Sequence, residues 1–137
     1  MRRMLLGMVV SAFVAVMATS AFAQSSCWNH NGSIMRFTER GTNFTMTYEK
    51  PRSVLRRAGV RRGTVLANGY SGPGGLNGTA RRFSRHCPST PLEYPVSGYF
   101  EGDYTIYLEG TRPVYNRCRP TGRTARDELL FEYVGPC

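Results

Sequence analysis

The sequence predicts an all-β fold: a small antiparallel meander that closes into a barrel or sandwich of about seven to eight strands, stapled by two disulfides. Three observations lead to this prediction. Apolar and polar residues alternate along short segments, which is the period of a half-buried strand. Turn signals separate these segments by about 8–12 residues, as in antiparallel sandwiches and barrels. Four cysteines follow the N-terminal segment, and an even number in an exported chain indicates disulfides.

The first two predicted strands form a hairpin. In IMRFT, Met35 and Phe37 share one face. In NFTMTYEK, Phe44, Met46 and Tyr48 share one face, and the polar residues between them share the other. The intervening ERGTN is rich in turn formers, so we expect the two strands to pair directly.

Residues 51–63 interrupt the alternation, because Pro51 has no N–H to donate within a sheet. Val54, Leu55 and Ala58 have the spacing of a single helical turn, which Gly59 would end. We therefore expect a structured loop here, held against the core by Val54, Leu55 and Val60.

The rest of the chain returns to strand patterns. TVLANGY is a short strand, and the glycine-rich SGPGGLNG is a turn. Its glycines have neither the Walker nor the Rossmann spacing of nucleotide-binding loops. TARRFSRHC and LEYPVSGYF continue the sheet, with Tyr94, Val96 and Gly98 on one side. The tight turn EGD, flanked by aromatic residues, is the clearest hairpin signal in the chain.

Two further strands complete the predicted sheet. YTIYLEG directs Tyr104, Ile106 and Leu108 inward, and ELLFEYV places Leu129, Phe131 and Tyr133 on one face. Between them, TRPVYNRCRPTGRTARD predicts a long polar connection. Consecutive hairpins of this kind favour an up-and-down meander that curls to close its edges.

Residues 1–23 predict a cleaved Sec-type signal peptide, which leaves residues 24–137 as a single all-β domain in the periplasm or outside the cell. Arg2 and Arg3 precede an apolar run, and Ala21-Phe22-Ala23 has the form of a cleavage site. The run is shorter than the roughly 20 residues of a membrane span, so an uncleaved anchor is the weaker alternative. We expect no membrane span in the mature protein.

The four cysteines are Cys27, Cys87, Cys118 and Cys137. Two disulfides are expected, and the spacing leaves all three pairings open. A metal site is not expected, because no two cysteines have C-x-x-C spacing and His30 and His86 are not at ligand intervals.

Positive charge is concentrated in one region of the chain. Without Arg2 and Arg3, 16 basic and 9 acidic residues remain, a net charge of +7. Residues 51–86 contain eight arginines and no acid. These arginines, our candidates for anion binding, are Arg52, Arg56, Arg57, Arg61, Arg62, Arg81, Arg82 and Arg85. If the loop and the following strand are neighbours, they form one electropositive face that attracts anions.

We therefore expect a non-enzymatic, monomeric binding protein whose arginine face meets an anionic glycan, lipopolysaccharide or another anionic envelope or host component. A solvated basic surface without a dedicated partner is the simpler alternative. An inhibitor or accessory domain acting on a protein partner is another alternative. Nucleic acid is not expected in the predicted compartment.

An enzyme is the least favoured reading, and we assign no catalytic residue, cofactor or metal. Disulfide-bonded cysteines are not nucleophiles, and catalysis would need a pocket that joins His30 or His86 to carboxylates. The stretch CWNHNGSIM contains the only tryptophan of the chain. We interpret it mainly as the start of the first strand, with Trp28 plugging one barrel end, and keep Trp28 and His30 as candidate ligand contacts.

Six strings spread along the chain carry a resemblance to known proteins: WNHNGSIM, YEKPRSVLRRAGVRRGTVLANG, GTARRF, YPVSGYF, YLEGTRPV and ELLFEY. The most distinctive motifs are W-N-H-N-G-S and Y-x-x-P-R-x-x-L before a G-T-x-L strand. With these motifs, most of the chain after residue 23 resembles a group of small, uncharacterised exported β-domain proteins of Rhizobiales-type bacteria. The resemblance implies bacterial origin and a periplasmic or secreted β domain, and it implies no activity. It also implies the pairs Cys87–Cys118 and Cys27–Cys137.

Overall fold

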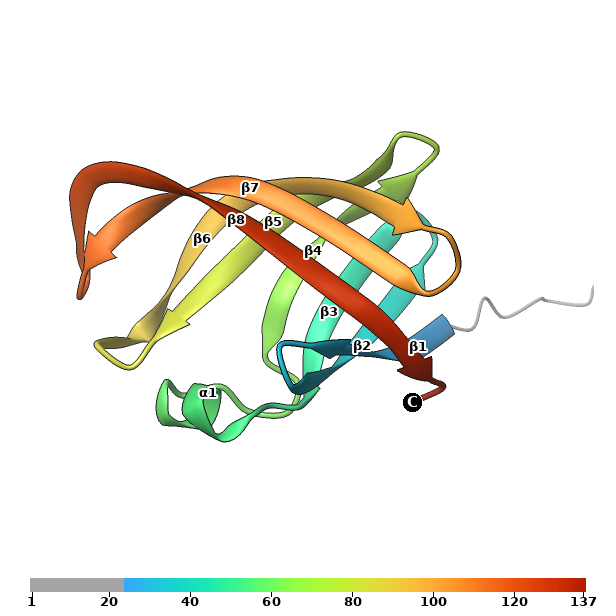
Figure 1. The fold of residues 1–137 in the computed structure, drawn as a ribbon, viewed down its shortest axis with the longest axis horizontal. Coiled ribbons are helices and arrows are strands. Elements are labelled where there is room, and N and C mark those ends of the chain that lie inside the picture. Colours follow the sequence, from blue (N-terminus) through green and yellow to red (C-terminus); the bar gives the residue numbers. More distant parts are fainter. Residues whose placement is uncertain (1–23) are drawn as a thin grey trace, which may run out of the picture.

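The computed structural model describes residues 24–137 as a closed antiparallel barrel of eight strands in sequential order, with one short helix (Figure 1). The elements are β1 (Gln24–His30), β2 (Ser33–Arg40), β3 (Asn43–Lys50), α1 (Ser53–Arg57), β4 (Val65–Gly72), β5 (Gly75–Ser84), β6 (Cys87–Glu101), β7 (Thr105–Asn116) and β8 (Arg119–Gly135). The predicted fold class is confirmed, and the barrel form is the one adopted. The predicted signal peptide, residues 1–23, lies outside the described residues.

The barrel closes where β1 meets β8. Each strand pairs with the next along the chain, and β1 then pairs with β8 through only three residue pairs. This seam joins Cys27, Trp28 and Asn29 to Gly135, Tyr133 and Glu132. Since β1 has 7 residues and β8 has 17, the beginning of β8 extends past the end of the seam.

The core fills the barrel interior with the predicted inward faces of the strands. Met35, Phe44, Met46, Ile106 and Phe131 are all almost completely buried. The alternation of buried and exposed positions along β2 and β3 follows the period of two seen in the sequence. The described side chains therefore fill the middle of the barrel with a packed core.

Glycines permit the sharp bend between β4 and β5. Gly69 and Gly78 lie opposite each other. A Cβ atom on Gly69 would lie 2.1 Å from the carbonyl oxygen of Asn77, and one on Gly78 would lie 2.1 Å from that of Asn68. Only glycine fits such a close approach of two backbones, which lets the sheet curve enough to close.

The predicted long polar connection at residues 111–127 is wrong. These residues continue β7 and begin β8, which pair as a hairpin around Arg117 and Cys118. Arg117 adopts a positive φ of 59° in this turn. The hairpin extends beyond the packed core, and most of its side chains are exposed. The alternation that signals a half-buried strand is therefore missing from its sequence.

Two smaller expectations about side chains are also wrong. Tyr104 lies in the β6–β7 turn and is exposed, because the strand begins only at Thr105. Val54 is exposed on α1, whereas Leu55 packs against the core and Val60 is completely buried. The short helix is present as predicted, with Leu55 and Ala58 on its inward face and Val54 outside it.

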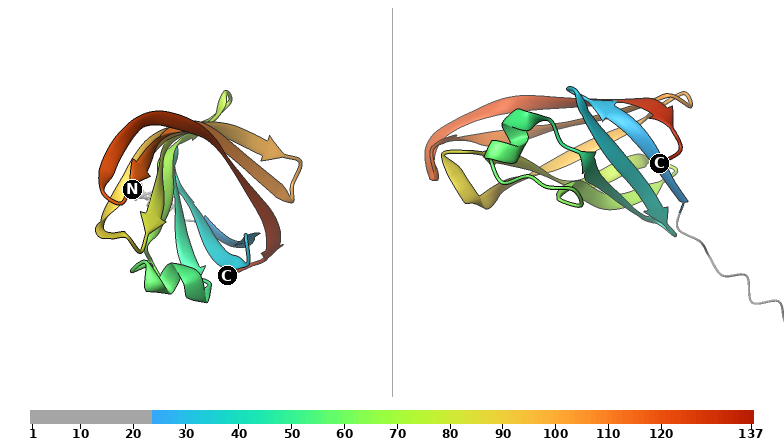
Figure 2. Two further views of the ribbon diagram at one scale, coloured as in Figure 1. Left: turned by 60° about the vertical axis from the view of Figure 1, so that its left-hand side comes forward. Right: turned by 90° about the horizontal axis from the view of Figure 1, so that it is seen from below.

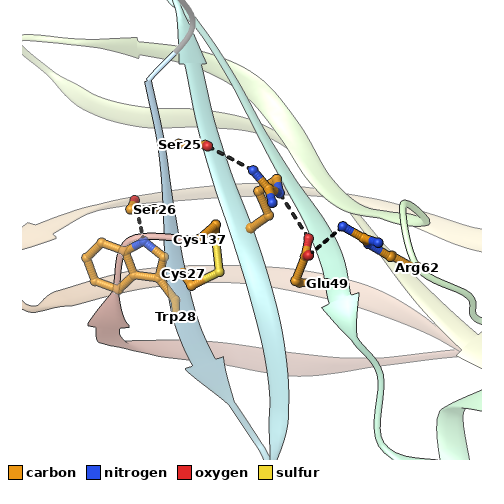
Figure 3. The surroundings of a disulfide bond; sticks show 8 residues. Ser25, Ser26, Cys27, Trp28, Glu49, Arg62 and Cys137 are labelled. Atoms are coloured by element: carbon orange, nitrogen blue, oxygen red, sulfur yellow. Dashed lines mark hydrogen bonds and ion pairs between the residues drawn. A yellow bond between two sulfur atoms is a disulfide. The ribbon is translucent and has the colours of Figure 1, made fainter.

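Both disulfides are present, with the pairing that the resemblance implied. Cys27 is bonded to Cys137 and Cys87 to Cys118. The first disulfide fastens the seam beside Trp28, whose indole N–H donates to the Ser26 hydroxyl at 2.8 Å (Figure 3). The second ties the tip of the β7–β8 hairpin to the start of β6.

Removing the two disulfides separately should have unequal effects. The bonded cysteines are 110 residues apart at the seam and 31 apart at the hairpin. In the chain-entropy model, loss of the bond lowers the free energy of unfolding by about 5 kcal/mol for the longer loop and about 4 kcal/mol for the shorter. Guanidinium unfolding of C27A/C137A and C87A/C118A measures both values. A smaller loss for C27A/C137A than for C87A/C118A would contradict the importance given to the seam.

Candidate functional site

The meander separates charge between the two ends of the barrel. In an up-and-down meander, every second connection lies at the same end, which here comprises residues 31–32, 51–64, 85–86 and 117–118. These connections contain no acidic residue and seven arginines: Arg52, Arg56, Arg57, Arg61, Arg62, Arg85 and Arg117. The opposite connections, 41–42, 73–74 and 102–104, contain Asp103 and no basic residue. We call the arginine-bearing end the mouth.

The mouth is hollowed into a pocket of about 430 Å³. Helix α1 and the middle of β8 line it, together with residues of β1, β3, β4, β5 and β6. In Figure 1, α1 and the β5–β6 and β7–β8 turns lie toward the left, and the turns of the opposite end lie toward the right. Figure 2 shows α1 beside the end of the barrel from two further directions.

Four of the eight predicted arginines line this pocket. They are Arg52, which precedes α1, and Arg81, Arg82 and Arg85 at the end of β5 and in the turn after it. The loop and the strand are thus brought together, as the electropositive face requires. The other four lie outside the pocket lining: Arg56, Arg57, Arg61 and Arg62.

Arg62 is held on the outer wall of the barrel instead of the mouth pocket. Its Nη2 donates to Glu49 Oε1 at 2.9 Å, and Arg36 Nε donates to the other oxygen of that carboxylate at 2.9 Å (Figure 3). Arg36 also donates to the Ser25 hydroxyl. These hydrogen bonds hold the pKa of Glu49 below its usual range. Arg62 therefore has a carboxylate partner already.

A second pocket, of about 410 Å³, adjoins the first and shares Arg82 and Ser84 with it. Arg112 and Arg117 of the β7–β8 hairpin also line it. Sequence reasoning missed these two arginines because the segment was taken for a polar connection. Arg112 and Val114 have the spacing of one strand face, but without an apolar–polar alternation this spacing alone does not indicate a strand.

Asp127 forms the charged centre between the two pockets. Arg112 Nε donates to its Oδ1 at 2.8 Å, and Arg82 Nη1 lies 3.9 Å from its Oδ2. Tyr94 is hydrogen-bonded to the same carboxylate, and burial together with this bond raises the pKa of the Tyr94 hydroxyl. Because a tyrosine with a raised pKa stays protonated, it remains a donor to Asp127. Four strands, β5, β6, β7 and β8, are thereby tied together at the mouth.

Of the two candidate ligand contacts near the N-terminus, His30 lines the mouth pocket and Trp28 does not. His30 Nδ1 donates to the carbonyl oxygen of Leu130 at 2.8 Å, since a carbonyl can only accept, and the ring stacks on Phe131. Desolvation by burial lowers the pKa of His30, and the charge of Arg52 adds to this effect. With Nδ1 donating, the neutral ring has Nε2 as its acceptor.

Among the described residues of the lining, no serine hydroxyl is hydrogen-bonded to a histidine ring. Asp127 shares the pocket with His30, so the carboxylate that an enzyme reading requires is present. That carboxylate is engaged by Arg112, and His30 Nδ1 is engaged by a backbone carbonyl. The Ser84 hydroxyl accepts from the His86 backbone N–H. No pair of nucleophile and base is therefore formed among these residues.

Within residues 24–137, no three His, Cys, Asp or Glu side chains lie together in a way that would hold a metal ion. No helix in this part of the chain has the length and hydropathy to cross a membrane. Comparison of the chain with protein-family models, with curated proteins and with solved structures finds no match. The geometry of the mouth is therefore the basis for a functional assignment.

The lowered pKa of His30 should make stability depend on pH. The His30 imidazole has a lower pKa in the folded protein than in the unfolded chain. As the pH falls below about 6.5, the unfolded chain therefore binds a proton at this imidazole more readily than the folded protein does. Stability is therefore full above that pH and declines as the solution becomes more acidic. Thermal unfolding between pH 7.5 and 5.5 should show a smaller loss for His30→Gln than for the native protein. His86→Gln is the control, because His86 is exposed, and it should keep the native loss. An equal loss in all three proteins would contradict the assignment.

Replacement of Asp127 should weaken the mouth. In Asp127→Asn, Arg112 loses its counter-ion while its side chain stays only 17% exposed. We expect a loss of about 1–3 kcal/mol in the free energy of unfolding, the usual penalty for an unsatisfied buried polar group. Glu128→Gln changes the adjacent, exposed carboxylate and should leave stability nearly unchanged. Urea unfolding measures both variants, and equal stabilities would rule out the central role of Asp127.

Proposed function

We propose that this protein is an exported, non-enzymatic binding protein whose arginine-bearing mouth binds an anionic component of the cell envelope or of a host. The observation that carries the proposal is the charge separation between the barrel ends. One set of connections has seven arginines and no acid, and the other has one acid and no basic residue. Such a separation attracts and orients anions as they approach.

The compartment is supported by the covalent structure. Cysteines at both ends of the described chain and in its middle are joined in two disulfides, and no described cysteine is free. Disulfides persist in oxidising compartments such as the periplasm or the extracellular space. Together with the charged, apolar and small-residue pattern of residues 1–23, this supports an exported protein in the periplasm or outside the cell.

The pocket composition supports binding as the activity. Arginine presents a planar fork of donors that matches phosphate and carboxylate groups. Arg52, Arg81, Arg82 and Arg85 come from the loop before α1 and from the end of β5 and its turn, so the fold gathers them at one pocket. Ser84 and His30, the potential nucleophile and base among the described lining residues, are not hydrogen-bonded to each other. A ligand held by arginines requires neither.

Binding of an anionic probe should depend on the mouth arginines and on salt. Purified lipopolysaccharide and heparin should bind R52A/R85A at least about tenfold more weakly than the native protein, because each lost charge-assisted hydrogen bond is a large part of such an affinity. Binding by the native protein should also weaken between about 50 and 300 mM NaCl, because salt screens exposed charges. Fluorescence anisotropy with labelled probes measures both effects.

The matched control is R40A/R126A, which removes the same net charge away from the mouth. Arg40 is exposed at the end of β2, and Arg126 is paired with Glu109 on the outer wall. This variant should bind almost as tightly as the native protein. Equal weakening of both variants would mean that net charge alone acts, and the mouth would lose its assignment. Capture of a single stoichiometric periplasmic protein, with no binding of either probe, would favour the inhibitor alternative.

A further inference from the structure

The mouth pocket has an apolar wall as well as arginines. Val54 and Leu55 of α1 face Phe83 of β5, Leu66 of β4 and Leu129 of β8 around the same cavity. Val54 is 48% exposed, and Leu55 and Phe83 are only partly buried. Apolar surface that lines a concavity in this way is a favourable place for an apolar group, because covering it releases water. A purely polar anion would leave this apolar wall exposed to water.

The cavity has a defined depth. Leu66, Tyr48 and Tyr94 line its inner part while being almost completely buried themselves. Farther inside, Met35 and Met46 are fully buried in the packed core. A ligand therefore occupies the mouth alone and does not thread the barrel. The volume of about 430 Å³ lies within the roughly 300–1,000 Å³ of small-molecule sites.

The arginines of the pocket differ in how far their charges are already balanced. Arg81 Nε donates to Glu93 at 3.2 Å and its Nη1 to Asn68 at 2.7 Å. Arg82 lies beside Asp127. Among residues 24–137, neither Arg52 nor Arg85 forms an ion pair with a carboxylate. Arg85 Nε donates to the His86 ring at 3.4 Å, which does not offset its positive charge, so both guanidinium groups can pair with an incoming anion.

Two observations place the charge of Arg52 at the pocket. Burial is the main influence on the pKa values of His30 and Tyr48, and the positive charge of Arg52 makes each pKa lower than burial alone would. Both residues line the cavity. The backbone N–H of Arg52 also donates to the buried Ser33 hydroxyl at 3.0 Å. The start of α1 is thereby fixed against β2, so that Arg52 is held in place at the rim.

We propose that the mouth binds one molecule of an amphipathic anion, with its phosphate or carboxylate head at Arg52 and Arg85 and its alkyl or aryl arm against Val54, Leu55, Leu66 and Phe83. This inference rests on the proposed function and specifies its ligand class. The same chemistry occurs in a free alkyl phosphate and in a lipid headgroup with its first methylenes. The proposal commits to a single molecule taken into the pocket, and a bilayer surface is an outcome of the test.

Isothermal titration calorimetry with octyl phosphate, hexyl phosphate, inorganic phosphate and octanol tests the proposal. Octyl phosphate should bind about tenfold more tightly than hexyl phosphate, since each buried methylene contributes to affinity. Inorganic phosphate and octanol should each bind much more weakly than octyl phosphate. R52A/R85A should weaken octyl phosphate binding by about tenfold or more, and Val54→Ser should reduce the difference between the octyl and hexyl compounds.

Two matched controls separate the pocket from the rest of the surface. R40A/R126A removes the same net charge from residues outside the mouth and outside the pocket lining. Val134→Ser removes an equivalent side chain that is 53% exposed elsewhere. Both controls should bind octyl phosphate as the native protein does, and circular dichroism should show that all four variants are folded. A loss of binding equal to that of the pocket variants would overturn the placement of the ligand.

The remaining outcomes distinguish this inference from the proposed function. Inorganic phosphate binding as tightly as octyl phosphate, with the same dependence on Arg52 and Arg85, would overturn the amphipathic ligand and leave anion binding intact. Co-sedimentation with phosphatidylglycerol–phosphatidylcholine vesicles, without binding of octyl phosphate, would identify a membrane surface as the ligand. That result would also overturn the single amphipathic ligand and leave anion binding intact. Octanol binding as tightly as octyl phosphate, unaffected by R52A/R85A, would overturn both proposals.

Discussion

Closure of the barrel between β1 and β8 is the constraint on which the rest of the structure depends. Three residue pairs and one disulfide make this contact, whereas the β7–β8 hairpin has a far longer ladder. Without closure, both strands would present unpaired edges, and the aromatic and methionine core would face water on one side. The covalent bond compensates for a short ladder at the point where the sheet has to return to its own beginning.

The mouth is a consequence of unequal strand lengths around this closed sheet. Strands β1 to β4 have 7 or 8 residues, whereas β6 and β8 have 15 and 17. The long strands therefore extend farther at the mouth than β1 to β4 do, and α1 lies on the side of the shorter strands. The pocket occupies the space between them. Asp127, with Arg82, Arg112 and Tyr94, ties the side of the longer strands together, and Cys87–Cys118 fastens the tip of its longest hairpin.

The sequence was sufficient to predict those features that depend on local pattern. Alternation identified the inward faces of Met35, Phe37, Phe44 and Met46, and these residues are buried. Pro51 and Gly59 marked the interruption that contains α1. The sequence left open whether the arginines of the loop and of β5 would be neighbours, and the structure brings four of them to one pocket.

Features that depend on register between strands could not be predicted. The cluster at Asp127 joins residues of β5, β6, β7 and β8, and no local signal relates Arg82 to Arg112 or to Tyr94. The β7–β8 hairpin has water on most of its surface, so its sequence lacks the alternation of a half-buried strand. Disulfide pairing likewise depends on which strands become neighbours, which the spacing of cysteines does not encode.

The position of Trp28 has a consequence for how this molecule is observed. It is the only tryptophan in the chain, it is 3% exposed, and its ring meets Tyr133 across the seam with centroids 5.3 Å apart. Its fluorescence should therefore respond to the opening of β1 from β8, and Trp28 is not among the residues that line the mouth pocket. Intrinsic tryptophan fluorescence is therefore a probe of barrel closure, and ligand binding at the mouth is followed by other measurements.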